Sequence, residues 1–199
     1  LKMDSDKISY EEKMNSLKKS GYVINGIPDM HNPEIRLGII KINNQWIFGK
    51  YYKNTFEYHL HDRKPFSYSN ALSTKLARTL VNIASANNDN IKLVDPCCGI
   101  GTVIIEALSM NLNIKGYEIN ESIAKHAQRN LEFFGYDNVI TCSDMHKIQE
   151  HYDTSIIDIP YGLFTPTTHE NQTAIIQTAR RISDKLILIA FENMSQDLQ

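Results

Sequence analysis

The chain has 199 residues, of which 42% are hydrophobic and 22% charged, and its formal net charge at pH 7 is −2. This composition fits one globular domain with a core of normal size, or one domain with a small appendage, and excludes a disordered chain. No apolar run approaches the roughly 20 residues that a membrane-spanning helix needs, and residues 1–10 lack the apolar stretch of a secretory signal. We therefore expect a cytoplasmic protein that does not bind a membrane.

Cysteine and histidine usage argues against both disulfides and metal. The cysteines are Cys97, Cys98 and Cys142, and an odd number that includes an adjacent pair does not form a disulfide framework. His59 and His61 have no cysteine or carboxylate cluster beside them that would complete a zinc site. We expect free thiols and no bound metal.

The first sixty residues predict a small helix-plus-hairpin segment. A helix is expected over residues 8–19, and two extended runs follow at 34–42 and 45–52, joined by Asn43-Asn44. Asparagine tolerates the positive φ that a tight turn requires, so the two runs should pair as a hairpin. Residues 53–68 have no clear period and are expected to form a connector.

Beyond this segment, short apolar runs alternate with helical patterns. Helices are expected over residues 70–85, 101–110, 121–134 and 170–182, and strands over residues 91–95, 113–118, 138–141, 154–158 and 185–191. Such alternation is typical of βαβ units and a parallel sheet. The sequence therefore predicts an α/β protein in two parts: residues 1–60, and a domain over residues 61–199 with a Rossmann-like sheet flanked by helices.

The strongest functional pattern is a strand that runs into a glycine turn, Leu93-Val94-Asp95-Pro96-Cys97-Cys98-Gly99-Ile100-Gly101-Thr102. Glycines let the backbone turn tightly and let a ligand approach without a Cβ in the way. A NAD fingerprint would have a third glycine where Ile104 stands. An acid ahead of the glycines also favours a cationic ligand, and a carboxylate at Asp95 suits the α-ammonium group of a methionine.

Acidic residues follow three successive predicted strands. Asp95 can bind an ammonium group, Glu118 both hydroxyls of a ribose, and Asp144 an adenine amino group. Each could instead cap a helix or carry a surface charge. However, the carboxyl edge of an open α/β sheet is where such folds bind ligands. The candidate cofactor residues at this edge are Asp95, Cys97, Gly99, Gly101, Thr102, Glu118, Ile119, Asp144 and Met145.

The fourth predicted strand ends in the candidate catalytic residues Asp158, Ile159, Pro160 and Tyr161, which resemble the (Asp/Asn)-Pro-Pro-(Tyr/Phe) motif of amino methyltransferases. An exocyclic amine on a base is a poor nucleophile, because its lone pair is delocalised into the ring. The Asp158 side chain and the Ile159 carbonyl can accept its two N–H groups and aim the lone pair at a methyl group, while Tyr161 stacks on the base. The alternative is a strand followed by a Pro-Gly turn with a core tyrosine.

Together, the motifs between about residues 46 and 192 resemble the THUMP-containing RNA methyltransferases that make N2-methylguanosine in tRNA. The likeness includes Arg63-Lys64-Pro65-Phe66, the glycine turn and Asp158-Ile159-Pro160-Tyr161-Gly162. It implies a class I methyltransferase fold, S-adenosylmethionine as cofactor, and a pocket that Phe66, Ser67 and Tyr68 help to close. It also implies RNA, in the first place tRNA, as partner, with a guanine methylated on its exocyclic amino group.

The sequence departs from this family in three places. Ile159 stands where the family has proline, no THUMP domain is recognisable in the first sixty residues, and the chain ends soon after the fifth predicted strand, where class I enzymes add two more. Either the chain is a fragment, or the sheet is short. Because the net charge is −2, we also expect a further RNA-binding domain or a partner protein to supply much of the affinity for RNA.

Several alternatives remain open at this point. The same motif would serve adenine in rRNA or DNA, or a protein glutamine, and the fold could also be kept as a non-catalytic binding module. A nicotinamide-dependent oxidoreductase is disfavoured by the missing third glycine. The basic residues ahead of the predicted sheet could bind phosphates or be merely solvated; they are Lys50, Lys53, Arg63, Lys64, Lys75 and Arg78.

Overall fold

The structure is a computed structural model that describes residues 8–29, 31–53, 57–68, 71–159, 168–190 and 194. The chain divides into two compact units, Leu1–Thr55 and Phe56–Gln199. Within the described ranges, no helix combines the length and the apolar character needed to cross a membrane.

The described residues of the smaller unit form one helix and one hairpin. Helix α1 (Tyr10–Val23) begins after Ser9, whose hydroxyl accepts a hydrogen bond from the Glu12 N–H group and so caps the first turn. Strands β1 (Leu37–Ile42) and β2 (Gln45–Lys50) pair antiparallel. Asn43 and Asn44 both adopt positive φ between them. The predicted helix and hairpin are therefore confirmed, although the helix runs on through Gly21 to Val23.

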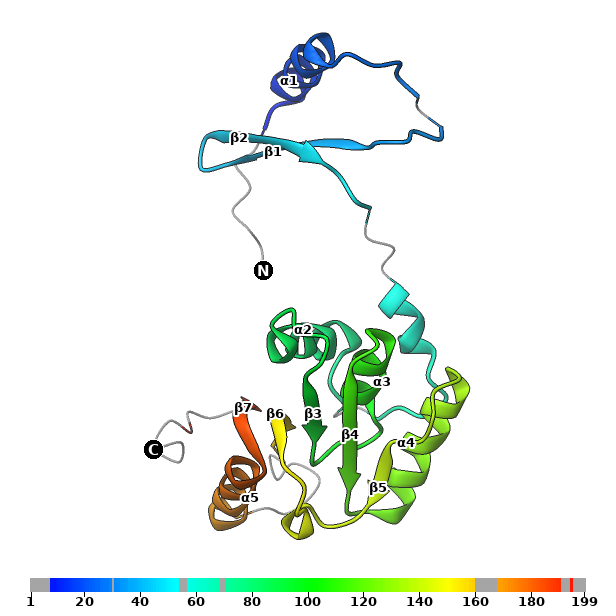
Figure 1. Cartoon of the computed structure of the whole chain (residues 1–199), viewed down its shortest axis with the longest axis vertical. Coiled ribbons are helices and arrows are strands. Elements are labelled where there is room, and N and C mark those ends of the chain that lie inside the picture. The colour runs from blue at the N-terminus through cyan, green and yellow to red at the C-terminus, as the bar shows by residue number, and fades with distance from the viewer. Residues whose placement is uncertain are drawn as a thin grey trace. The chain divides into compact units, whose positions relative to one another are not determined.

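The larger unit is built on a five-stranded parallel sheet with the order β5-β4-β3-β6-β7 (Figure 1). The strands are β3 (Lys92–Asp95), β4 (Asn113–Glu118), β5 (Ile140–Cys142), β6 (Tyr152–Asp158) and β7 (Ser183–Ile189). From β3 the order runs outward through β4 to one edge and through β6 to the other. The point between β3 and β6 is thus a topological switch point, where open α/β sheets bind their ligands.

Helices cover both faces of this sheet. One hydrophobic core cluster includes residues of α2 (Thr74–Ser85), α3 (Thr102–Ser109) and α4 (Glu121–Phe133). The second cluster includes residues of α5 (His169–Ile182) and of the 3-10 turn η2 (Met145–Lys147). Leu93 and Ile156 belong to the first cluster, whereas their neighbours Val94 and Ile157 belong to the second. The alternation follows from the two-residue period of a strand that is buried on both faces. The predicted α/β fold is confirmed.

One expectation was wrong. Residues 57–63, expected to be part of an irregular connector, form a 3-10 helix, η1 (Glu57–Arg63). The Nδ1 atom of His61 lies 2.6 Å from the fully buried carboxylate of Glu106 in α3. Arg78 of α2 also contacts that carboxylate, at 3.3 Å. These contacts hold η1 against α2 and α3, and because they join residues far apart in the chain, no local sequence period could reveal them.

Candidate active site

Three carboxylates lie at the carboxyl edge of the sheet. Asp95 ends β3, Glu118 ends β4 and Asp158 ends β6. Strand β3 pairs with β4 on one side and with β6 on the other, so Asp95 lies on the central of these three strands. The structure therefore brings the first candidate cofactor acid and the candidate catalytic acid together at the switch point.

The carboxyl group of Asp95 is almost fully buried, and one of its oxygens accepts a hydrogen bond of 3.2 Å from the Cys97 N–H group. Burial raises the pKa of Asp95 to about 8, and the nearby carboxylates of Asp158 and Glu118 contribute to the increase. A carboxyl group whose pKa is raised by two neighbouring carboxylates favours a cation beside it, because a positive charge relieves the repulsion between the acids. S-adenosylmethionine carries such charges on its sulfonium and ammonium groups.

Glu118 is oriented by the backbone on both sides of it. Its Oε2 atom accepts a hydrogen bond from Gly99 at 3.1 Å, and its Oε1 atom accepts one from Asn120 at 2.8 Å. Each carboxylate oxygen has a second lone pair, which remains available to a ribose hydroxyl. The same carboxylate thus fastens the glycine turn and can receive a ligand.

Two positions of the glycine turn, Gly99 and Gly101, have backbone conformations that favour glycine. Their φ values are +53° and +82°, in the left-handed region that favours glycine because it lacks a Cβ. A Cβ on Gly101 would also lie 3.3 Å from the Cδ1 atom of Leu131. Gly101 is the N-cap of α3 and Thr102 is its first residue, so the free N–H groups of the first helical turn start beside the carboxyl edge.

The segment Phe66–Tyr68, here called the strap, lies against this turn. The backbone of Phe66 is hydrogen-bonded to the side chain of Asn130 in α4. The hydroxyl of Tyr68 lies 2.5 Å from the position of a Cβ on Gly99. Burial raises the pKa of Tyr68 to about 12, and the acids Glu118, Asp95 and Asp158 contribute. Ser67, which lies between Phe66 and Tyr68 in the chain, is exposed. The strap thus brings the Tyr68 phenol to the turn and to the three acids.

The other candidate cofactor residues lie close to the same edge. The thiol of Cys97 is 3.5 Å from the sulfur of the buried Met145, and Ile119 leaves the end of β4 with 71% of its surface exposed. Asp144 accepts a hydrogen bond of 2.9 Å from the His146 N–H group and so caps η2. The helix-cap alternative for Asp144 is thus realised, and an adenine contact by its carboxylate stays a prediction.

Two of the four candidate catalytic residues are described. Asp158 is the last residue of β6. Ile159 is buried, and its N–H group donates to the Ile189 carbonyl at 3.1 Å, which keeps the chain aligned with β7 beyond the end of β6. Pro160 and Tyr161 lie outside the described residues. The catalytic roles of all four stay predictions.

Sequence reasoning overlooked Asn130. It lies on the buried side of α4 with Ala127 and Leu131 and is itself fully buried. A polar amide on an apolar helical face would have been the pattern to notice, because a buried amide must find hydrogen-bond partners.

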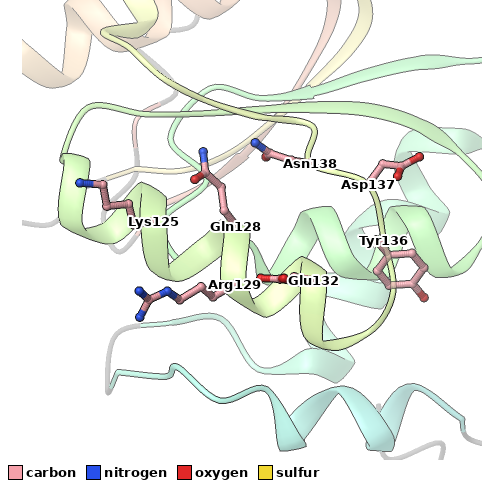
Figure 2. Close-up of a pocket in the computed structure, with 7 residues that line it drawn as sticks. All are labelled: Lys125, Gln128, Arg129, Glu132, Tyr136, Asp137 and Asn138. Carbon is pink, nitrogen blue, oxygen red and sulfur yellow. The ribbon is translucent and has the colours of Figure 1, made fainter.

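The exposed side of α4 has a hollow of about 350 Å³ with side chains of both charges, and none of the predicted site residues lines it (Figure 2).

Comparison with known proteins identifies the family. Residues 61–194 match the family described as RMKL-like, methyltransferase domain. The chain belongs to this family. Its methyl donor is therefore S-adenosylmethionine, and the predicted class of enzyme, a methyltransferase dependent on this cofactor, is confirmed.

Two curated relatives are named tRNA (guanine(10)-N2)-dimethyltransferase. The chain is 36% identical to that of Pyrococcus abyssi over 52% of its own length and 32% of the relative's. It is 28% identical to that of Methanothermobacter thermautotrophicus over 71% of its own length and 44% of the relative's. The chain thus spans less than half the length of either relative. Both names agree with the family that the sequence motifs resemble.

A solved structure shares the fold. The magnesium protoporphyrin IX methyltransferase of Synechocystis PCC 6803, with bound S-adenosylmethionine, superimposes with a TM-score of 0.53 at 20% identity, over 73% of this chain and 77% of that one. At this identity the likeness establishes the fold alone, and it confirms the class I methyltransferase arrangement.

Proposed function

We propose that this domain transfers a methyl group from S-adenosylmethionine to the exocyclic amino group of a guanine in tRNA. The observation that carries the proposal is the position of Asp95 and Asp158 at the ends of adjacent parallel strands. In this proposal Asp95 binds the positive end of the cofactor and Asp158 holds the nucleophile, so both reactants would meet at one sheet edge.

The chain's own groups would act mainly by orientation. The Asp158 carboxylate and the Ile159 carbonyl would accept the two amino N–H groups of the base, which turns the nitrogen lone pair towards the methyl donor. When bound, S-adenosylmethionine supplies an electrophilic methyl group on a positively charged sulfur. The new bond is N–C, the broken bond is S–C, and the positive charge passes to the nitrogen. Asp158 is then positioned to receive the proton that the nitrogen releases.

The choice of guanine in tRNA is supported by the names of the two relatives. Because this chain covers less than half of either relative, we further propose that RNA is bound in part by a further domain or a partner protein. A net charge of −2 supports this division of labour, since phosphate binding depends on lysine and arginine. We propose the cytoplasm, where tRNA is present, as the place of action.

The direct test is transfer of labelled methyl groups from S-adenosylmethionine to bulk tRNA, rRNA, DNA and protein in parallel, followed by digestion and nucleoside analysis of the labelled fraction. Label in N2-methylguanosine from tRNA is expected. Label in N6-methyladenosine or in protein would replace the proposed substrate while keeping the chemistry. Absence of label from every fraction, with S-adenosylhomocysteine still bound, would favour a non-catalytic binding module.

A further inference from the structure

The side chain of Asn130 joins two segments of the candidate cofactor site. Its Nδ2 group donates to the Phe66 carbonyl at 3.0 Å and to the Ile100 carbonyl at 3.0 Å, and its Oδ1 atom accepts from the Phe66 N–H group at 2.9 Å. Ile100 stands between Gly99 and Gly101 of the glycine turn. One amide in α4 therefore holds both the strap and the turn.

The amide has no donor to spare. A primary amide offers two N–H donors, and both are used on backbone carbonyls. Asn130 is fully buried, so water cannot readily replace a lost partner. Removing these donors would therefore leave the carbonyls of Phe66 and Ile100 without this partner in the protein interior.

A second contact fixes the strap to the same helix. The ring of Phe66 stacks on the imidazole of His126, one helical turn before Asn130, with the centroids 4.2 Å apart and the planes 7° from parallel. Phe66 is thus held by both its backbone and its ring, two residues before Tyr68 in the chain. The Tyr68 hydroxyl in turn lies directly over Gly99 and near the three acids.

From these contacts we infer that Asn130 is a positioning residue for cofactor binding: it locks the strap to the glycine turn so that Tyr68 covers the cofactor. Asn130 would not touch the cofactor. It would act through Phe66 and Ile100, which set the spacing between the covering phenol and the turn beneath it. The inference rests on the proposed assignment of the cofactor site to this turn.

The decisive variant is Asn130→Asp. Aspartate keeps the shape and an acceptor for the Phe66 N–H group, but when ionised it loses both donors and faces two carbonyls. Asn130→Ser removes the amide without adding a charge, so it provides the same test if Asn130→Asp does not fold. The matched control is Gln128→Glu, which makes the same chemical change on the same helix. Gln128 donates to the Ile140 carbonyl at 3.3 Å and lines the hollow on the exposed side of α4 (Figure 2).

The readouts are the affinity for S-adenosylhomocysteine by calorimetry, the melting temperature, and amide hydrogen exchange. Asn130→Asp and Asn130→Ser should bind S-adenosylhomocysteine at least about tenfold more weakly, which corresponds to the loss of one or two hydrogen bonds. Exchange should rise in residues 66–68 and 99–101 and stay unchanged in β7. Gln128→Glu should bind within about twofold of the wild type, whatever its melting temperature.

A merely structural role would lower the melting temperature of the Asn130 variants and leave the affinity of the folded protein unchanged; that result would overturn the inference. The wild-type protein supplies an independent check that no folding defect can obscure. Adding S-adenosylhomocysteine should slow amide exchange in residues 66–68 together with residues 99–101, and exchange in the strap that does not respond would also overturn it. If the wild type binds no S-adenosylhomocysteine at all, the assignment of the cofactor site fails instead.

Discussion

The hydroxyl of Tyr68 lies 2.5 Å from the point that a Cβ on Gly99 would occupy. A methyl group there would displace the phenol, and Gly99 also has a φ of +53° that disfavours any other residue, at a cost of about 1–2 kcal/mol. Gly99→Ala should therefore weaken binding of S-adenosylhomocysteine by about tenfold or more. Calorimetry on the purified protein measures this directly.

Adding Tyr68→Phe to Gly99→Ala separates the two causes. Without the hydroxyl, the Cζ atom of the residue 68 ring would lie 3.7 Å from the Cβ position on Gly99, which is an ordinary van der Waals contact. The double variant should recover part of the lost affinity, so the two substitutions should be non-additive. Strict additivity would show that Tyr68 does not cover the turn in solution.

Asp158→Ala should abolish methyl transfer and leave the affinity for S-adenosylhomocysteine within a few-fold. Its proposed work is to orient the nucleophile in the transition state rather than to bind the cofactor. The matched control is Asp184→Ala, at the opposite end of the neighbouring strand β7, where the side chain is 74% exposed. Retention of most activity in Asp158→Ala would mean that the loop after β6 is structural.

Cofactor binding should release a proton at pH 7. With a pKa of about 8, the unliganded Asp95 is mostly protonated at that pH, and a cationic ligand favours its carboxylate form. Calorimetry with S-adenosylmethionine in two buffers of different ionisation enthalpy should show up to about one proton released, and none once the pH is well above 8. Asp95→Asn should abolish the release, and a release that persists in this variant would assign the proton to another group.

The carboxyl group of Asp95 should also make the free energy of unfolding of the unliganded domain depend on pH. Folding raises the pKa of Asp95 from 3.8 to about 8, so between these values the folded state holds a proton that the unfolded state lacks. The stabilisation is complete below the lower value and is lost as the pH rises through the higher one, with a slope of at most about 1.4 kcal/mol per pH unit. Chemical denaturation across this range should show a shallower fall for Asp95→Asn than for the wild type.

The thiols of the glycine turn should not take part in the chemistry. Burial raises the pKa values of Cys97 and Cys98, and the carboxylates of Asp95 and Glu118 raise them further. A nucleophilic thiolate is therefore strongly disfavoured. The double variant Cys97→Ser with Cys98→Ser should lose some stability and cofactor affinity but keep turnover in the methyl-transfer assay. A folded variant that binds cofactor yet has no activity would point to a covalent cysteine mechanism.

Arg63 and Lys64 are two of the candidates for a phosphate-binding strip, and they directly precede the strap in the chain. Arg78 is bound to Glu106 and Ser109, whereas Arg63 is exposed. If both residues contact phosphates, replacing them with alanine should weaken RNA binding. It should also flatten the slope of log affinity against log salt by roughly 0.7 to 0.9 for each lost contact. Arg180→Ala with Lys147→Ala removes the same charge from α5 and η2 as a control; equal effects of the two pairs would establish that the first pair is merely solvated.

Much of the site could be predicted from the sequence because its parts are local. Asp95, Gly99 and Gly101 follow one apolar strand within a few residues, and Glu118 ends the next. Alternating strands and helices force the carboxyl ends of parallel strands to a common edge. The fold class, the glycine turn and the acids Asp95 and Glu118 therefore follow from periodicity and spacing, whereas Asp158 was found through its resemblance to a family motif. The family comparison agrees with the fold and the cofactor.

Only the tertiary structure decided which of these parts are neighbours. Strand order places Asp158 beside Asp95 rather than at a distant edge, and no local pattern records strand order. Asn130 reaches backbone groups 64 and 30 residues away, and His61 meets Glu106 across 45 residues. Hydrogen bonds of this kind depend on how helices and strands pack together once they have formed. Neither the helix η1 nor the attachment of the strap to the glycine turn could therefore be predicted from local sequence patterns.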